Sequence, residues 1–192
     1  VMLWIQAKED NNIGWWCIAS LLLTVQAAGD FLPQIDNYVI NIYFFNAVIV
    51  FSYLSLMIGC LKFLNIKINR CYIPLGMLIY FSVSIYGYYS GFEVNERRFL
   101  ISIFNILTLT ISMVAILKLS NQHYLIEKMF FTILTTGHIF IYIFWIYLIF
   151  TGPNQTLFIY SLTPTYIIDA FIIISLLLLL LARVRSKLEL EI

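Results

Sequence analysis

Long apolar stretches separated by short polar breaks recur along this chain, and this pattern constrains the fold more than any single motif. A helix rises 1.5 Å per residue, so about 20 apolar residues cross the hydrocarbon core of a bilayer. The complete stretches cover residues 13–28, 39–64, 71–89, 99–119, 129–150 and 166–182, and residues 1–6 read as the last turns of an earlier helix. The pattern predicts an all-α polytopic membrane helix bundle, with six full transmembrane helices and the end of a seventh.

The composition favours a membrane environment in the same way. Hydrophobic residues make up 62% of the chain and charged residues only 11%, whereas soluble domains carry about 25% charged residues. The formal net charge of +1 argues against a nucleic-acid partner, because such binding needs a concentrated basic face. The sequence therefore predicts the lipid bilayer as a partner and no nucleic acid.

The lysines and arginines predict the orientation, because cytoplasmic loops carry an excess of them. Alternate breaks put two cations on one side and all the others on the opposite side. The two are Arg97 and Arg98, and the others are Lys8, Lys62, Lys67, Arg70, Lys118, Lys128, Arg183, Arg185 and Lys187. We expect a multi-pass protein of the plasma membrane with a cytoplasmic carboxy terminus.

The last stretch, "LLLLLLARVRSKLELEI", runs from apolar to charged residues without glycine or proline. We assign residues 1–182 to one transmembrane, sensor-like domain and residues 183–192 to the start of a cytoplasmic linker helix. Arg183, Arg185 and Lys187 would anchor this signal-coupling helix at the cytoplasmic face, and Leu188 lies on a face that could begin a dimerising coil. We expect the chain to be a fragment at both ends, with the helix continuing past Ile192 and a homodimer forming through it.

Four polar residues fall inside predicted spans, where each costs free energy unless it has a partner. They are Asn46, Asn105, His138 and Asp169. His138 could be a protonation switch or a ligand contact, because imidazole changes charge in the physiological range, but a neutral histidine bonded to a neighbouring helix is the favoured interpretation. Counted from the outer ends of the predicted spans, His138 lies about 18 Å deep and Asp169 about 7 Å deep. We therefore expect these two residues not to touch.

The expected partner of Asp169 is Arg98 or Arg97, near the same outer depth. Such a pair would either fix helix packing, which is favoured, or line an outward-facing pocket. Asn46 and Asn105 could each form an interhelical hydrogen bond of about 1 kcal/mol. The candidate residues for sensing a ligand or signal are thus His138, Asp169, Arg98, Asn46 and Asn105.

Motifs for catalysis, metals and cofactors are missing from the sequence. It has no HExxH, glycine-rich phosphate loop or carboxylate cluster, so we expect no catalytic residue, no metal site and no cofactor. The three cysteines are expected to pack without forming a disulfide. Aromatic residues near the outer breaks favour an interfacial belt, and the alternative is a pocket for an unknown small or lipophilic ligand.

Two segments carry a resemblance to a known family. "WWCIASLLLTVQAAGDFLP" and "NAVIVFSYLSLMIGCLKFLN" resemble the amino-terminal membrane region of bacterial diguanylate cyclases. "ERRFLISIFNILTLTISMVAILKL" is similar to the family's next element, with Arg98 as its matching arginine. The residues that fit the order are Trp15, Trp16, Pro33, Asn46, Ser52, Tyr53, Gly59 and Phe63.

The resemblance implies a location in the bacterial inner membrane and a role in signal transduction. The catalytic GGDEF sequence is absent, so the chain would be the sensory half of a diguanylate cyclase and would pass a signal to a cytoplasmic output domain. Two alternatives stay open, namely a small multi-pass transporter or channel and a non-catalytic subunit of a membrane complex. Transport would favour helices broken by glycine or proline in two matching halves, and the sequence places no proline well inside a predicted span.

Overall fold

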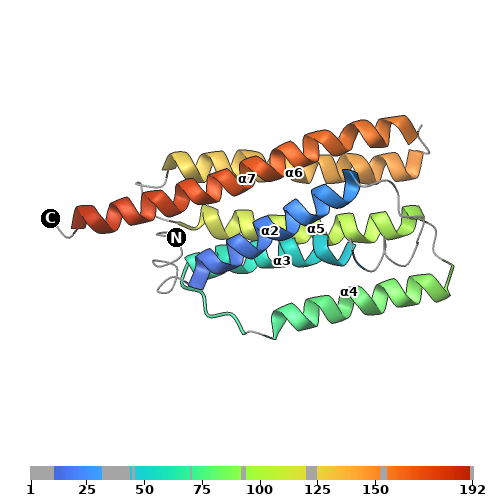
Figure 1. The fold of residues 1–192 in the computed structure, drawn as a ribbon, viewed down its shortest axis with the longest axis horizontal. Coiled ribbons are helices and arrows are strands. Elements are labelled where there is room, and N and C mark those ends of the chain that lie inside the picture. Colours follow the sequence, from blue (N-terminus) through green and yellow to red (C-terminus); the bar gives the residue numbers. More distant parts are fainter. Residues whose placement is uncertain are drawn as a thin grey trace.

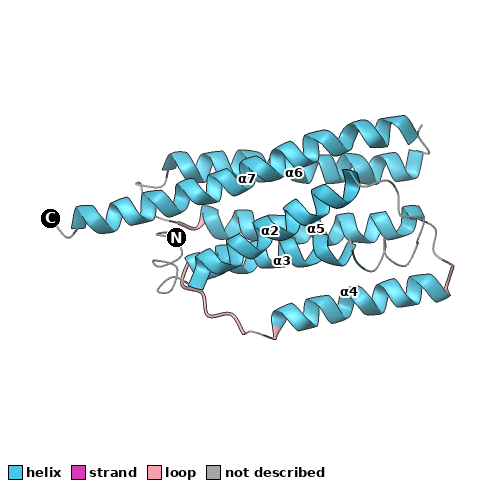
Figure 2. Ribbon diagram, viewed as in Figure 1, coloured by secondary structure: helices cyan, strands magenta, loops and turns pink. Residues whose placement is uncertain are grey.

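The computed structural model describes residues 11–31, 44, 46–69, 71–91, 94–119, 125–151 and 155–190. The part of the chain described is helical throughout, apart from short turns and connections (Figure 2). The helices are α2 (Asn11–Phe31), α3 (Asn46–Phe63), α4 (Tyr72–Tyr89), α5 (Val94–Leu117), α6 (Leu125–Thr151) and α7 (Gln155–Leu190). The predicted all-α class is confirmed.

The helices lie side by side and alternate in direction along the long axis of the molecule (Figure 1). Helix α3 packs against α2, α4 and α5, and α6 packs between α5 and α7. Helix α2 also contacts α7, which closes a bundle of five helices. Helix α4 lies at the edge of this bundle, beside α3 (Figure 1).

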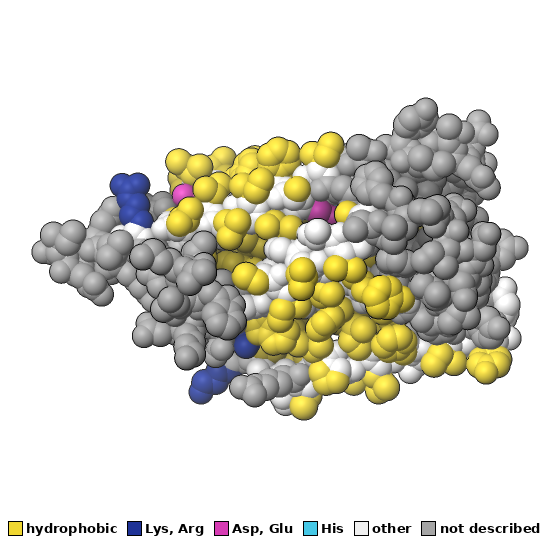
Figure 3. Space-filling model, viewed as in Figure 1, with side chains coloured by type: hydrophobic (Ala, Val, Ile, Leu, Met, Phe, Trp, Pro, Cys, Tyr) yellow, Lys and Arg dark blue, Asp and Glu magenta, His cyan; other side chains and the backbone are white. Residues whose placement is uncertain are grey.

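The five bundled helices share one apolar core. Large side chains such as Leu56, Phe131 and Leu179 are at most 1% exposed there. Other apolar side chains face outward, among them Leu78, Ile133 and Phe140, each more than 60% exposed. Apolar side chains cover much of the middle of the molecule in the space-filling view (Figure 3). Outward apolar surface on this scale marks a lipid or protein contact.

Three helices are long and apolar enough to cross a membrane: Asn46–Phe63, Phe99–Leu117 and Leu125–Thr151. The apolar parts of α2 and α4 are shorter, at Gly14–Ala27 and Tyr72–Gly87. Within the residues described, three helices rather than the predicted six meet this measure, so the prediction of six full transmembrane helices is wrong by it. Residues 1–6, predicted as the end of a seventh helix, lie outside the described part.

Helix α7 begins earlier than the sequence predicts. The segment up to Pro164 was expected to be a polar outer break, whereas α7 starts at Gln155 and continues to Leu190. The predicted boundary between residues 182 and 183 lies inside this one helix. Its far end extends beyond the rest of the bundle (Figure 1). Arg183, Arg185, Lys187 and Leu188 are all part of α7.

The described lysine and arginine side chains gather at one end of the bundle, where α3, α5 and α7 finish and α4 and α6 begin (Figure 3). They are Lys62, Lys67, Lys118, Lys128, Arg183 and Arg185. We call this end the basic end.

Hydrogen bonds cap the helix ends at the basic end. Asn65, with φ of 59°, lets Ile66 N–H reach Leu61 O at 3.1 Å after α3, which is a Schellman cap. Lys128 Nζ donates to Leu119 O at 2.9 Å after α5.

Candidate functional site

Five polar side chains from four helices meet inside the bundle. They are Tyr53 of α3, Asn105 of α5, His138 and Tyr142 of α6, and Asp169 of α7. Asn105 and His138 are fully buried, and Asp169, the most exposed of the five, is 6% exposed. Burying a polar group costs free energy unless the group is hydrogen-bonded. We call this set of five residues the polar network.

Tyr53 lies at the centre of the polar network. Its hydroxyl donates to Asp169 Oδ1 at 3.0 Å and accepts from the Tyr142 hydroxyl at 3.2 Å. The same oxygen lies 3.2 Å from His138 Nε2. One tyrosine of α3 thus holds side chains of both α6 and α7.

Asn105 extends the network to α5. Its Nδ2 donates to the Tyr142 hydroxyl at 3.0 Å, so the bonds run in one direction, from Asn105 through Tyr142 and Tyr53 to the Asp169 carboxylate. Bonds aligned in this way polarise one another and become stronger. Asn105 Oδ1 is buried and has no hydrogen-bond partner among the described residues.

His138 is held on two sides by Tyr142 and Asp169. Its ring stacks on that of Tyr142, one helical turn away, with centroids 4.9 Å apart and planes 6° apart. Its Nδ1 lies 3.1 Å from Asp169 Oδ1. That contact is close but makes no hydrogen bond of acceptable geometry.

The expectation that His138 and Asp169 do not touch is wrong. His138 lies thirteen residues before the end of α6 at Thr151, and Asp169 lies fourteen residues after the start of α7 at Gln155. The two residues are therefore equally deep, because the segment that seemed to be a loop forms the first turns of α7. Asp169 takes Tyr53 and His138 as partners. The side chains of Arg97 and Arg98, its predicted partners, lie outside the described residues.

A second set of contacts joins α7 to α3 at the basic end. The Arg183 guanidinium lies over the Phe63 ring, 4.8 Å from its centroid. Phe63 in turn lies 5.3 Å from the Trp16 ring, which rests on Gly59 of α3. A cation over an aromatic face is an attractive contact. Helix α7 is thus tied to α3 both at Asp169 and at Arg183.

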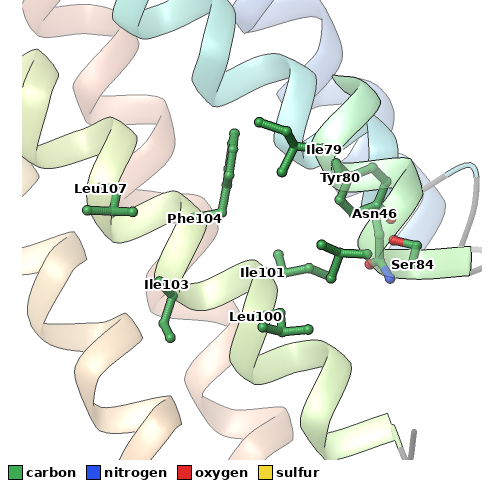
Figure 4. Close-up of a pocket in the computed structure, with 10 residues that line it drawn as sticks. Asn46, Ile79, Tyr80, Ser84, Leu100, Ile101, Ile103, Phe104 and Leu107 are labelled. Carbon is green, nitrogen blue, oxygen red and sulfur yellow. The ribbon is translucent and has the colours of Figure 1, made fainter. Parts of the chain in front are cut away.

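Asn46 is not part of the polar network. It lies seven residues before Tyr53 on α3, about 10 Å along the axis, at an apolar cleft between α4 and α5 (Figure 4). The cleft has a volume of about 180 Å³. Asn46 and Ser84 line it together with apolar side chains such as Ile79, Phe104 and Leu107 (Figure 4).

Sequence reasoning missed the two tyrosines of the polar network. With 13 tyrosines in the chain, Tyr53 and Tyr142 did not stand out as site residues. Helical spacing offered a signal, because Tyr142 lies four residues after His138 and therefore on the same face. The side chains of Lys187 and Leu188, predicted to couple the signal, lie outside the described residues.

The polar network suits proton chemistry better than metal binding. Within the part of the chain that is described, no group of three or more histidine, cysteine or acidic residues could hold a metal ion. The network instead offers a carboxylate, an imidazole and two phenols in hydrogen-bonding reach.

No protein-family model, no curated protein and no solved structure matches the chain.

Proposed function

We propose that this chain is an integral membrane input module that receives a signal within the bundle and passes it along α7 to a cytoplasmic output domain. The observation that carries the proposal is the position of Asp169. It is bonded to α3 inside the core, and it belongs to a helix of 36 residues that extends beyond the bundle. A change at Asp169 can therefore be transmitted mechanically along one continuous helix.

The two links between α7 and α3 support this proposal. The first joins Asp169 to Tyr53, and the second joins Arg183 to Phe63. Breaking the first link leaves α7 held to α3 at the basic end, so α7 would pivot or rotate there. Motion of this kind in a packed helix is a known means of switching between two states.

The location in the membrane is part of the same proposal. Three described helices have the length and apolarity to cross a bilayer, and the outward apolar side chains would face lipid. We place the chain in the bacterial inner membrane as a multi-pass protein that crosses the bilayer at least through these three helices. The basic end faces the cytoplasm, because positive charge is retained there.

The resemblance to the membrane region of diguanylate cyclases supplies the kind of output. Joined to such an enzyme, α7 would control the approach of two catalytic domains in a homodimer. A helix that enters the cytoplasm as a dimerising coil is suited to this task.

A small transporter or channel is the second candidate, and the polar network is the observation that favours it. An ionisable pair inside membrane-spanning helices is a common feature of ion and proton pathways. A transporter would move an ion or solute across proteoliposomes that contain the protein, whereas an input module would move α7 without flux.

Distance measurements between spin labels test the input module. Labels are placed at Lys187→Cys on α7 and Lys118→Cys beside α5, in a background without native cysteines and in lipid nanodiscs. Asp169→Asn is expected to shift the distance distribution, because it weakens the bond between α7 and α3. Asn46→Ala is the control and should leave the distances unchanged. Identical distributions for Asp169→Asn and the parent protein would overturn the proposal.

A further inference from the structure

The hydrogens available to the polar network determine which bonds can coexist. A tyrosine hydroxyl has one hydrogen and two acceptor positions. Tyr142 receives a hydrogen from Asn105 and gives its own to Tyr53. Tyr53 gives its hydrogen to Asp169. The 3.2 Å contact between Tyr53 and His138 Nε2 then requires that Nε2 carry a hydrogen and donate it.

The other side of the imidazole needs a further proton. With Nε2 protonated, a neutral ring would turn the lone pair of Nδ1 toward Asp169 Oδ1, and two acceptors 3.1 Å apart repel each other. A proton on Nδ1 or on the carboxyl group removes this repulsion and makes the pair neutral overall. A neutral pair is also the form that costs least when buried.

We propose that Tyr53, His138 and Asp169 form a binding site for one exchangeable proton and that release of this proton is the signal received by the module. This inference rests on the proposed function for its consequence, but the proton site is defined by the geometry of the three side chains. The ligand of the module would then be a proton.

A proton relay through Tyr53 accounts for the release of this proton. With the extra proton on Nδ1 and Asp169 ionised, His138 Nε2 gives its hydrogen to the Tyr53 oxygen, while Tyr53 gives its own hydrogen to Asp169 Oδ1. The protonated carboxyl then loses that proton to water, since the Asp169 side chain keeps 8% exposure while that of His138 has none. The products are neutral His138 with its hydrogen on Nδ1, ionised Asp169 and one proton in solution.

The relay removes one of the two bonds that Tyr53 makes to the pair. Before release, the hydrogen of Tyr53 points to Asp169 and joins α3 to α7, while His138 Nε2 donates to the Tyr53 oxygen and joins α3 to α6. After release, the hydrogen that Tyr53 received points back to His138 Nε2, so the bond between α3 and α6 remains with its direction reversed. Asp169 keeps its contact with His138 but loses the bond from Tyr53. Proton loss therefore loosens α7 from α3 inside the core.

The described side chains around the site determine which other groups could compete for this proton. Among the described residues, Asn105 of α5 faces the site without a titratable group, and Tyr142 of α6 and Tyr53 of α3 are the titratable neighbours of the pair. Helix α2 presents Trp16, Ala19 and Leu23 to the core. Cys60 lies seven residues beyond Tyr53 on α3, and the described cations lie at the basic end.

Infrared difference spectra of the full chain in nanodiscs, recorded over the range from about pH 5 to about pH 8, test the site. The parent protein should release about one proton that Asp169→Asn and His138→Gln do not release. Tyr53→Phe keeps the charged pair and the ring volume, and it should abolish the tyrosine hydroxyl band change. Tyr80→Phe, a buried tyrosine in a separate apolar cluster, should change neither.

The proton site would be overturned if Asp169→Asn and the parent protein released the same number of protons. It would also be overturned if Tyr53→Phe still showed the change in the tyrosine hydroxyl band. Spin-label distances measured across the same pH range separate the two proposals. Proton release with no movement of α7 would overturn the input module and leave the proton site standing. Movement of α7 in Asp169→Asn, with no proton transition in the parent, would overturn the proton site alone.

Discussion

Gly59 of α3 lies so close to the indole of Trp16 in α2 that a Cβ at this position would collide with the ring. The missing side chain lets a large aromatic residue rest directly on the backbone of the neighbouring helix. Trp16 is only 5% exposed as a result, and it also contacts Phe63. Small residues at such contacts are the usual means by which membrane helices approach closely.

Gly59→Ala is expected to separate α2 from α3. The methyl group would force the indole to move, and overpacking of this kind costs about 1–3 kcal/mol. Unfolding in a denaturing detergent, followed by tryptophan fluorescence, would measure the loss. Gly14→Ala is the matched control, because a Cβ at that position of α2 meets nothing within 4 Å. It should leave stability unchanged or raise it by about 1 kcal/mol, through helix propensity. Equal effects of the two substitutions would contradict the close contact.

Tyr142→Phe is expected to cost about 1–3 kcal/mol, because it strands buried donors and acceptors on both sides. The Asn105 amide would lose its described partner, and Tyr53 would lose the hydrogen that it accepts. Adding Asn105→Leu removes the stranded amide together with its unpartnered Oδ1. The double variant should therefore be more stable than Tyr142→Phe alone, as the same unfolding measurement would show. A double variant less stable than the single one would argue against the bond between these two side chains.

Lys128→Met is expected to destabilise the basic end by about 0.5–1.5 kcal/mol, the usual contribution of one hydrogen bond. The ammonium group donates to Leu119 O just after α5, and methionine keeps most of the apolar stem without a donor. Hydrogen exchange at the end of α5 should become faster. Lys118→Met, which changes an exposed lysine at the same end, is the control and should leave that exchange rate unaltered.

Much of the polar network could be foreseen from the sequence, residue by residue. His138, Asp169 and Asn105 stood out because polar side chains are costly in an apolar helix. Their partners could not be foreseen, because contacts depend on where each helix begins. The segment before Tyr166 contains proline and polar residues, which favour a loop, yet it forms the first turns of α7. That difference of about three turns is what brings Asp169 level with His138.

The tyrosines show a second limit of sequence reasoning. A tyrosine in a membrane helix is equally compatible with the interface, the lipid and the core. Only the packing of α3 against α5 and of α6 against α7 determines that Tyr53 and Tyr142 point inward. Asn46 illustrates the reverse case, since its polarity marked it as a candidate although it lies at a separate apolar cleft.

The depth of His138 has an electrical consequence. It lies near the middle of the 27 residues of α6. With α6 spanning the membrane as proposed above, a proton that reaches His138 from either side has crossed part of the transmembrane field. One charge that crosses the whole field gains or loses about 2.3 kcal/mol per 100 mV. A proton bound halfway would feel roughly half of that energy. Occupancy of the site would then report voltage as well as acidity, and an energised cell would differ from a depolarised one at the same external pH.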